Sequence, residues 1–262
     1  MVDFHTHTWM CGHATGTPGE YAQAAADKGL SVMGFSDHAP LPEHLRENVT
    51  MHPHQVEEYI AIVQDLQEKF KGRLAIRLGF EVDFPLRDSF DRKYFTDSRI
   101  DYLIGSCHYI EDWPVDHHLV AHEYEVRGVD NIYRDYYDTL AGCAGSGLFN
   151  IIGHFDLTKK FGNRPQADMS AKIRIAAKAA ARTQTAFEVN TSGLRKPVKE
   201  MYPSEDIVKI MFEENVPATL GSDSHCPEDI GADFDKAAAM LKKCGYRKIA
   251  VFEKRKMSLI EL

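Results

Sequence analysis

The sequence predicts an α/β fold in which parallel strands alternate with crossover helices and close into a barrel. Short β-branched or apolar runs recur along the 262 residues, and segments of helical periodicity separate them. Such alternation is typical of a parallel sheet covered by helices. About eight strand–helix units in 262 residues match one (β/α) barrel with one unit distorted or missing. The predicted strands span residues 2–4, 32–36, 74–82, 102–106, 149–153, 186–190, 216–220 and 248–252.

The predicted helices have recognisable starts and faces. Thr17, Pro18 and Glu20 supply an N-cap, a first-turn proline and a capping box for a helix that ends near Gly29. After Pro53, apolar side chains between residues 56 and 70 recur every three or four positions and form one buried face. Further helices are predicted over residues 131–144, 169–185, 204–215 and 233–244.

An open, doubly wound sheet is the structural alternative to a barrel. That fold would need a Gly-rich phosphate-binding turn after the first strand, but the segment His5-Thr6-His7 occupies this position. No internal repeat or linker interrupts the chain. We therefore expect a single barrel domain over residues 1–262.

The composition is that of an ordinary globular protein, with 44% hydrophobic and 27% charged residues. A net charge of −8 argues against a general basic surface for nucleic acid. We find no signal peptide and no apolar run long enough to span a membrane, so we expect a cytoplasmic protein without a membrane partner. The five cysteines form no CxxC pair, which favours reduced, mostly buried thiols.

Polar and ionisable residues follow each of the first seven predicted strands. In parallel-strand barrels the reactive groups lie at the C-terminal ends of the strands, so these residues are expected to meet at one rim. Because alternate residues of a strand point the same way, His5 and His7 can chelate one ion, as can Asp223 and His225. Histidine and carboxylate without cysteine suit zinc, manganese or iron, and nine such groups exceed the needs of one tetrahedral ion. The predicted ligands are His5, His7, His13, His38, Glu81, His108, His154, Asp223 and His225.

Other polar residues have weaker claims. Four other polar residues lie at or just after the ends of predicted strands, but no role is assigned to them: Asp37, Asp156, Glu188 and Asn190. The remaining histidines fit capping or surface positions, and the acidic loop that carries three of them could cover the site, although solvated loop residues are the favoured interpretation. These histidines are His44, His52, His54, His117, His118 and His122.

These motifs resemble those of the polymerase-and-histidinol-phosphatase (PHP) superfamily of metal-dependent phosphoesterases, and within it the monofunctional histidinol-phosphatases. The superfamily motifs are specific in combination, and the similarity covers nearly the whole chain. They read DFHTH at residues 3–7, FSDH at 35–38, GFE at 79–81 and GSDSH at 221–225. The histidinol-phosphatase motifs read GSCHYI at residues 105–110, GHFDLTKKFG at 153–162 and EVNTSGLRK at 188–196.

The resemblance implies a distorted (β/α)7 TIM-like barrel with three divalent metal ions. It places His5, His7, Glu81 and Asp223 around one ion. Glu81 bridges to a second ion, which His108 and His154 hold. The third ligand set is His13, His38 and His225.

The resemblance also implies hydrolysis of L-histidinol phosphate to L-histidinol and phosphate in L-histidine biosynthesis. Two metals ~3.5–4 Å apart would generate a bridging hydroxide for in-line attack on phosphorus. Asp223 or His225 is expected to transfer the proton to the leaving group. Cationic side chains should stabilise the negative charge of the phosphoryl group. Arg195 is the first candidate, because a guanidinium can bind phosphate through two hydrogen bonds, and Lys160 or Lys159 is the second.

Two alternatives remain open at this point. A PHP phosphoesterase could act on another phosphomonoester or on nucleotides, although the acidic balance disfavours a nuclease. A non-catalytic metal-binding module could retain the barrel, but it would be expected to carry damaged ligand sets. The sequence does not identify the residues that would contact the imidazole of histidinol, and it does not determine the oligomeric state. Asp83 or Glu111 could bind the ammonium group of the substrate.

Overall fold

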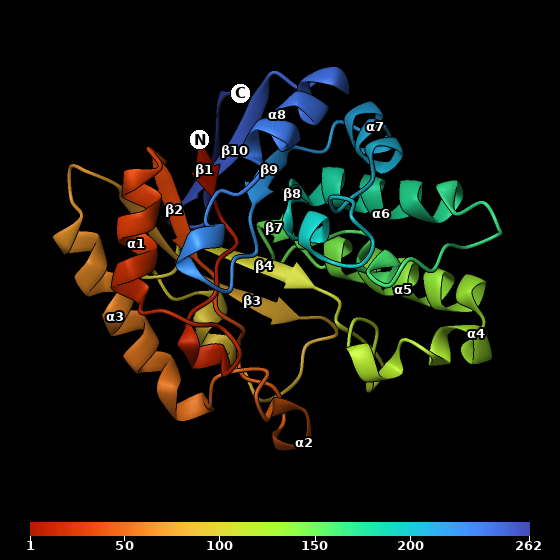
Figure 1. The fold of residues 1–262 in the computed structure, drawn as a ribbon, viewed down its shortest axis with the longest axis horizontal. Coiled ribbons are helices and arrows are strands. Elements are labelled where there is room, and N and C mark those ends of the chain that lie inside the picture. Colours follow the sequence, from red (N-terminus) through yellow and green to blue (C-terminus); the bar gives the residue numbers. More distant parts are fainter.

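Seven parallel strands form the centre of the computed structural model, which describes residues 1–262. Each strand pairs with the next along the chain, in the order β1-β2-β3-β4-β7-β8-β9 (Figure 1). Each strand except the first and the last carries at least two β-branched or aromatic residues, which favour strands, and most of the side chains are buried. The strands are β1 Val2–Asp3, β2 Val32–Phe35, β3 Ala75–Asp83, β4 Tyr102–Ser106, β7 Ile151–Ile152, β8 Ala186–Asn190 and β9 Ala218–Gly221.

The first and last strands meet, and this contact closes the sheet into a barrel. The Phe4 amide donates to the carbonyl of Leu220, and the Asp223 amide donates to the carbonyl of His5. Thr6 and Ser224 form a further parallel bridge. The structure therefore confirms the predicted α/β barrel and its seven parallel strands.

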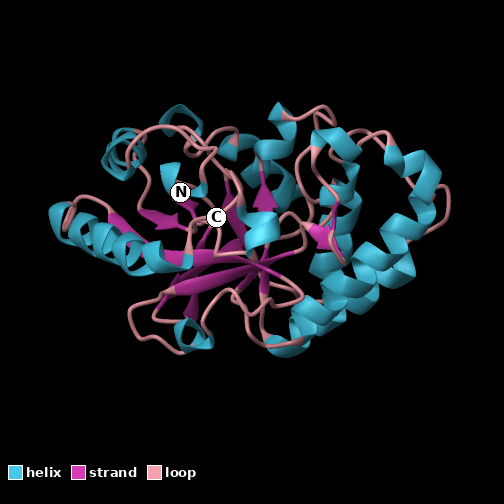
Figure 2. Ribbon diagram, turned by 90° about the horizontal axis from the view of Figure 1, so that it is seen from below, coloured by secondary structure: helices cyan, strands magenta, loops and turns pink.

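Helices cover the outside of the barrel, with α1 and α3 on one flank and α5, α6 and α7 on the other (Figures 1 and 2). The predicted capping box is present, because Thr17 and Glu20 exchange hydrogen bonds at the start of α1. The connection from β3 to β4 contains only the 3-10 turn Arg92–Phe95, so this unit lacks its α-helix. The helices are α1 Pro18–Asp27, α2 Glu43–Arg46, α3 Val56–Lys69, α4 Glu123–Arg127, α5 Val129–Gly145, α6 Ser170–Thr183, α7 Glu205–Glu213 and α8 Phe234–Lys243.

The eighth predicted strand does not join the barrel. It forms β10, Lys248–Glu253, which pairs with β11, Lys256–Glu261, as an antiparallel hairpin. Two positive-φ residues, Lys254 and Arg255, make the tight turn between these strands. The hairpin packs on the barrel through Phe252, so Ile249, Ala250 and Phe252 of β10 are buried without parallel pairing, whereas Leu259 and Ile260 of β11 stay exposed.

A continuous apolar core fills the barrel and the layer beneath the helices. Phe4 lies edge-on to Tyr102 at 5.0 Å and to Phe252 at 5.4 Å between ring centroids. The Tyr102 side chain lies over Gly34 and Gly79. An added Cβ would come within 2.3 Å of its hydroxyl at Gly34 and within 2.6 Å of its ring at Gly79. These two glycines therefore make room for an aromatic ring inside a small barrel.

The connection between β4 and β7 carries structure that the sequence did not predict. It contains a small hairpin, β5 Tyr109–Ile110 with β6 Trp113–Pro114, followed by the 3-10 turn His118–Val120 and helix α4. All five cysteines are free thiols, four of them buried, as expected. None of the helices is both long and apolar enough to cross a membrane.

Candidate metal centre and substrate cavity

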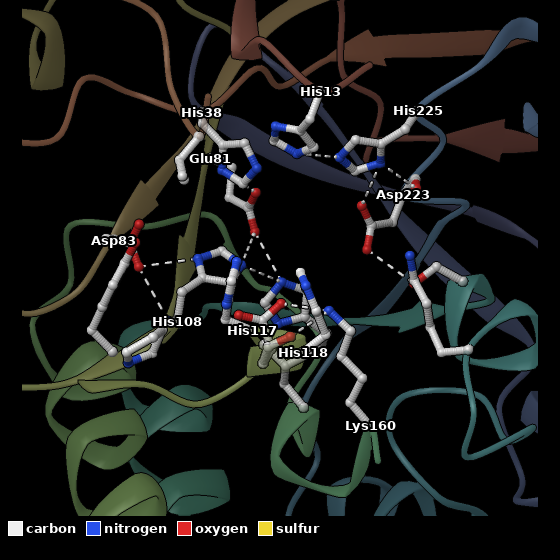
Figure 3. Close-up of a pocket in the computed structure, with 18 of the residues that line it drawn as sticks. His13, His38, Glu81, Asp83, His108, His117, His118, Lys160, Asp223 and His225 are labelled. Carbon is white, nitrogen blue, oxygen red and sulfur yellow. Dashed lines mark hydrogen bonds and ion pairs between the residues drawn. The ribbon is translucent and has the colours of Figure 1, made fainter. Parts of the chain in front are cut away.

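All nine predicted ligands converge at the C-terminal rim of the barrel. Each comes from the end of a strand or from the loop that follows it, which is why His13 and His225, 212 positions apart, become neighbours (Figure 3). Most of them are buried or nearly so. The predicted convergence on one site is therefore what the structure shows, whereas the assignment of individual ligands to ions stays a prediction.

Glu81 lies at the centre of this cluster. Its Oε1 is 3.0 Å from His154 Nε2, and its Oε2 is 2.9 Å from His38 Nδ1 and 3.4 Å from His5 Nε2. Ser106 also donates to Oε1 at 2.6 Å. One carboxylate thus contacts histidines from three other strand ends, as a bridging ligand would.

The remaining ligands form pairs around Glu81. Nε2 of His5 and Nε2 of His7 are 3.1 Å apart, and His7 Nε2 is 3.3 Å from an Asp223 oxygen. A second pair joins Nε2 of His108 to Nε2 of His154 at 3.1 Å.

The third expected ligand set is less compact than the other two. His13 and His225 approach within 3.0 Å through their Nε2 atoms. His38, by contrast, is nearest to Glu81, and its ring centroid lies 6.5 Å from that of His225. His38 therefore stands between the third set and the bridging carboxylate.

In several of the imidazoles, Nδ1 lies within hydrogen-bond distance of an acceptor oxygen on the side away from Nε2. Nδ1 of His5 lies 2.9 Å from both oxygens of Glu188, and Nδ1 of His108 lies 3.0 Å from Asp83. Nδ1 of His225 lies 3.1 Å from the carbonyl oxygen of Asp223. A proton on Nδ1 leaves a lone pair on Nε2, which is the tautomer that binds a metal.

The donor set fits divalent cations. Glu81 Oε2 is buried and receives no well-directed hydrogen bond, although three histidine nitrogens lie within 3.6 Å of it. Two Nε2 lone pairs 3.1 Å apart repel each other unless a cation or proton lies between them. Nitrogen and carboxylate oxygen ligands at such separations are those of zinc, manganese or iron sites.

The charges of the cluster are strongly coupled. Burial alone would raise the pKa of Glu81, but His5, His38 and His108 hold that pKa well below its ordinary value. Burial lowers the pKa of His5, but the Glu188 and Glu81 carboxylates outweigh it and raise that pKa well above the usual range. Glu81 is therefore ionised and available as a ligand.

Asp223 has an unusual backbone. Its φ of 51° lies in the left-handed region, which L-residues other than Asn and Asp seldom adopt. Its side chain accepts hydrogen bonds from Ser192 and Asn190 at 3.0 and 3.3 Å. The turn and these donors aim the carboxylate at His7.

A cavity of about 670 Å³ opens above the cluster, which is a common size for a small-ligand site. Residues from the β4–β7 connection cover one side of it, so His117 and His118 line the cavity rather than standing only in solvent. Asp83 holds His108 by its ring nitrogen and its amide. Glu111, in contrast, is exposed and does not line the cavity.

The four basic residues near the site have different surroundings. Lys160 lines the cavity and pairs with Asp116 at 2.8 Å. Lys196 also lines it, is partly buried, and forms no ion pair. Lys159 does not line the cavity, because its fully buried ammonium is bound by Asp156 and Glu200.

Arg195, the first predicted phosphate ligand, does not line the cavity either. Its guanidinium donates to the carbonyl oxygen of Ser222 at 2.6 Å and pairs with Asp229 at 3.0 Å. One of its nitrogens, Nη1, is buried without a partner. The structure therefore brings Lys160 to the cavity and leaves Lys159 and Arg195 engaged outside it.

Comparison with known proteins places this arrangement in a family. A model of the PHP domain matches residues 3–192. The chain belongs to the PHP domain family. It is 44% identical, over 98% of both chains, to a protein of Deinococcus radiodurans named probable histidinol-phosphatase. It is 27% identical to the histidinol-phosphatase of Bacillus subtilis, over 92% of this chain and 98% of that one.

Solved structures support the fold of this PHP domain. The crystal structure of histidinol phosphate phosphatase from Lactococcus lactis superposes with a TM-score of 0.82 at 22% identity, covering 98% of each chain. That protein was crystallised with zinc, L-histidinol and phosphate. The likeness confirms the PHP-type barrel predicted from the sequence.

Sequence reasoning missed several residues that shape this PHP site. Asp116 in the β4–β7 connection and Lys196 after β8 both line the cavity, and Glu188 holds His5 from below. Lys196 lies within a motif that the sequence singled out, next to the arginine that was preferred as a phosphate ligand. Glu188 was visible as a carboxylate at a strand end, but burial beneath the rim is not readable from sequence spacing.

Proposed function

We propose that this chain is a metal-dependent phosphomonoesterase that hydrolyses L-histidinol phosphate to L-histidinol and phosphate in L-histidine biosynthesis. The observation that carries the proposal is the convergence of eight imidazole and carboxylate side chains around Glu81 beneath an open cavity. Full-length similarity to proteins named histidinol-phosphatase supports the substrate. A closed structural metal site would not need such a cavity.

The proposed cofactor is a set of three divalent ions, zinc, manganese or iron. His5, His7, Glu81 and Asp223 would hold the first ion, and Glu81 with His108 and His154 the second. His13, His38 and His225 would hold the third. When bound, such ions activate water as a nucleophile and neutralise phosphoryl oxygens.

The chain's own cations complete the phosphate site in this proposal. Lys160 and Lys196 line the cavity and would bind phosphoryl oxygens as point charges. Arg195 could reach phosphate only if its guanidinium exchanged the Ser222 carbonyl or Asp229 for it. In this proposal Asp223 or His225, which both line the cavity, would transfer the proton to the leaving alkoxide.

The test is phosphate release by chelator-stripped protein reloaded with zinc, manganese or iron. We expect a metal-dependent rate that favours L-histidinol phosphate over a nucleoside monophosphate and that is lost in Glu81→Gln. Circular dichroism of Glu81→Gln checks that the variant folds. Equal or faster hydrolysis of the nucleotide would remove the biosynthetic assignment and leave the phosphoesterase.

A further inference from the structure

Glu188 is a carboxylate buried beneath the metal centre at the end of β8. Its side chain is fully buried, and no lysine or arginine pairs with it. Its Oε1 accepts from the His154 amide at 2.8 Å and from Asn190 Nδ2 at 2.8 Å. Both of its oxygens lie 2.9 Å from Nδ1 of His5.

The contacts of Glu188 reach both of the compact ligand sets. His5 belongs to the first set, and the backbone of His154 belongs to the second. Asn190 extends the network, because its amide nitrogen also lies 3.3 Å from an oxygen of Asp223. One carboxylate thus touches strand ends β1, β7 and β8 at once.

We infer that Glu188 is a positioning residue that fixes the tautomer and ring orientation of His5 and thereby sets the metal affinity of the centre. The reason is that a carboxylate can only accept hydrogen bonds, and Nδ1 of His5 lies 2.9 Å from both of its oxygens. His5 must then carry its proton on Nδ1, and its Nε2 lone pair points at Glu81 and His7. This inference deepens the metal-dependent function proposed above and rests on it.

The packing shows that the carboxylate is specifically accommodated. A Cβ on Gly221 would lie 2.3 Å from Glu188 Oε2 and 2.7 Å from the Cβ of His5. Any side chain at position 221 would therefore displace either the carboxylate or the histidine. The glycine that opens the motif at residues 221–225 leaves the space in which Glu188 meets His5.

A glutamine at position 188 changes the balance between the two His5 tautomers. Its amide oxygen keeps the bonds from the His154 amide and from Asn190 at the Oε1 position, so its amide nitrogen takes the Oε2 position, 2.9 Å from Nδ1 of His5. The amide oxygen can still accept from Nδ1 at 2.9 Å, but the amide nitrogen competes as a donor and favours the tautomer with the proton on Nε2, which lacks the metal-binding lone pair. The side-chain volume is unchanged, so the packing around Gly221 is preserved.

The experiment measures zinc affinity by competition with a chromogenic chelator, on the wild-type chain, Glu188→Gln and the control Glu58→Gln. Glu58 is exposed on α3 and forms no ion pair. We expect roughly 10- to 100-fold weaker zinc binding for Glu188→Gln and no change for the control. Wild-type zinc affinity in a folded Glu188→Gln would overturn the inference.

The histidine tautomers give a second readout that does not depend on the variant folding. In the zinc-loaded wild-type chain, ¹⁵N NMR of labelled histidine should show His5 protonated at Nδ1 and not at Nε2, assigned with a His5→Gln variant. A His5 proton on Nε2 would contradict the inference even if Glu188→Gln does not fold. Zinc binding without hydrolysis of L-histidinol phosphate would instead refute the proposed function and leave the role of Glu188 standing.

Discussion

Replacing Lys196 by methionine is expected to weaken phosphate binding without weakening the fold. Lys196 is partly buried in the cavity wall, and no carboxylate lies within ion-pair distance of its ammonium. A hydrogen bond between a charged lysine and a charged phosphoryl oxygen contributes about 1.5–3 kcal/mol. At 1.4 kcal/mol for each factor of ten, kcat/KM should fall roughly 10- to 150-fold.

Lys160 provides the internal contrast for this prediction. Its ammonium is bound by the side chain and the carbonyl of Asp116, so its removal leaves a partly buried carboxylate unpaired. Lys160→Met should therefore lose both activity and about 1–3 kcal/mol of unfolding free energy. Lys196 has no such partner, and its removal should leave the unfolding free energy within about 0.5 kcal/mol of wild type.

The assay combines initial rates of phosphate release with inhibition by inorganic phosphate and urea denaturation. Lys196→Arg should recover part of the affinity because it keeps the charge. Lys178→Met, on the exposed face of α6, controls for the loss of one positive charge from the protein. An unchanged inhibition constant for phosphate in Lys196→Met would refute the reasoning, as would a large loss of stability.

Three further predictions concern the metal centre and the core. Glu81→Gln should reduce the rise in melting temperature that zinc gives the stripped wild-type chain, since the proposed bridging ligand is lost while His13, His38 and His225 remain. Scanning calorimetry measures this rise, and a rise equal to that of the wild type contradicts the prediction. Burial lowers the pKa of His108, but Asp83 and Glu81 outweigh it and raise that pKa to about 10. In metal-stripped protein, the contribution of protonated His108 to the free energy of unfolding is therefore complete below pH ~6.5 and is lost as the pH rises toward about 10. Asp83→Asn should make the free energy of unfolding, measured by urea denaturation, depend less on pH over this range. Gly34→Ala would place a Cβ 2.3 Å from the Tyr102 hydroxyl and should cost about 1–3 kcal/mol of unfolding free energy, whereas a loss below about 0.5 kcal/mol would show that the core yields.

The sequence predicted the barrel and the composition of the site because both depend on local pattern. Strand periodicity and the capping residues at Thr17 and Glu20 are encoded over a few positions, and the strand ends are where ligands can meet. Residues 248–252 form the predicted strand, but the same local pattern does not determine its antiparallel pairing. An apolar run indicates that a strand is buried, but it does not indicate which strand it pairs with. Here the turn at Lys254 and Arg255 pairs β10 with β11, and the first and last strands of the barrel already pair with each other.

The surroundings of the cations were not predictable in the same way. Lys159 and Lys160 are adjacent in sequence, yet one is fully buried against Asp156 and the other faces the cavity. The 3-10 turn Leu157–Lys159 ends between the two lysines, so their side chains point in different directions. No periodic sequence pattern predicts such a short turn. Likewise Lys196 lines the cavity and its neighbour Arg195 does not, because Asp229 from a distant loop engages the guanidinium.

The position of the metal centre links its assembly to closure of the barrel. His5 and His7 follow β1, whereas Asp223 and His225 follow β9, and these two segments are joined by the Asp223 amide to the His5 carbonyl and by the His7 amide to the Ser224 carbonyl. The backbone contacts that close the sheet are thus the ones that bring four of the nine predicted ligands together. A cation that binds these ligands binds the closed barrel and not the open chain, so metal binding stabilises the seam between the first and last strands. Glu188 lies under the same seam, and its carboxylate therefore connects ring closure, histidine orientation and metal affinity in one contact.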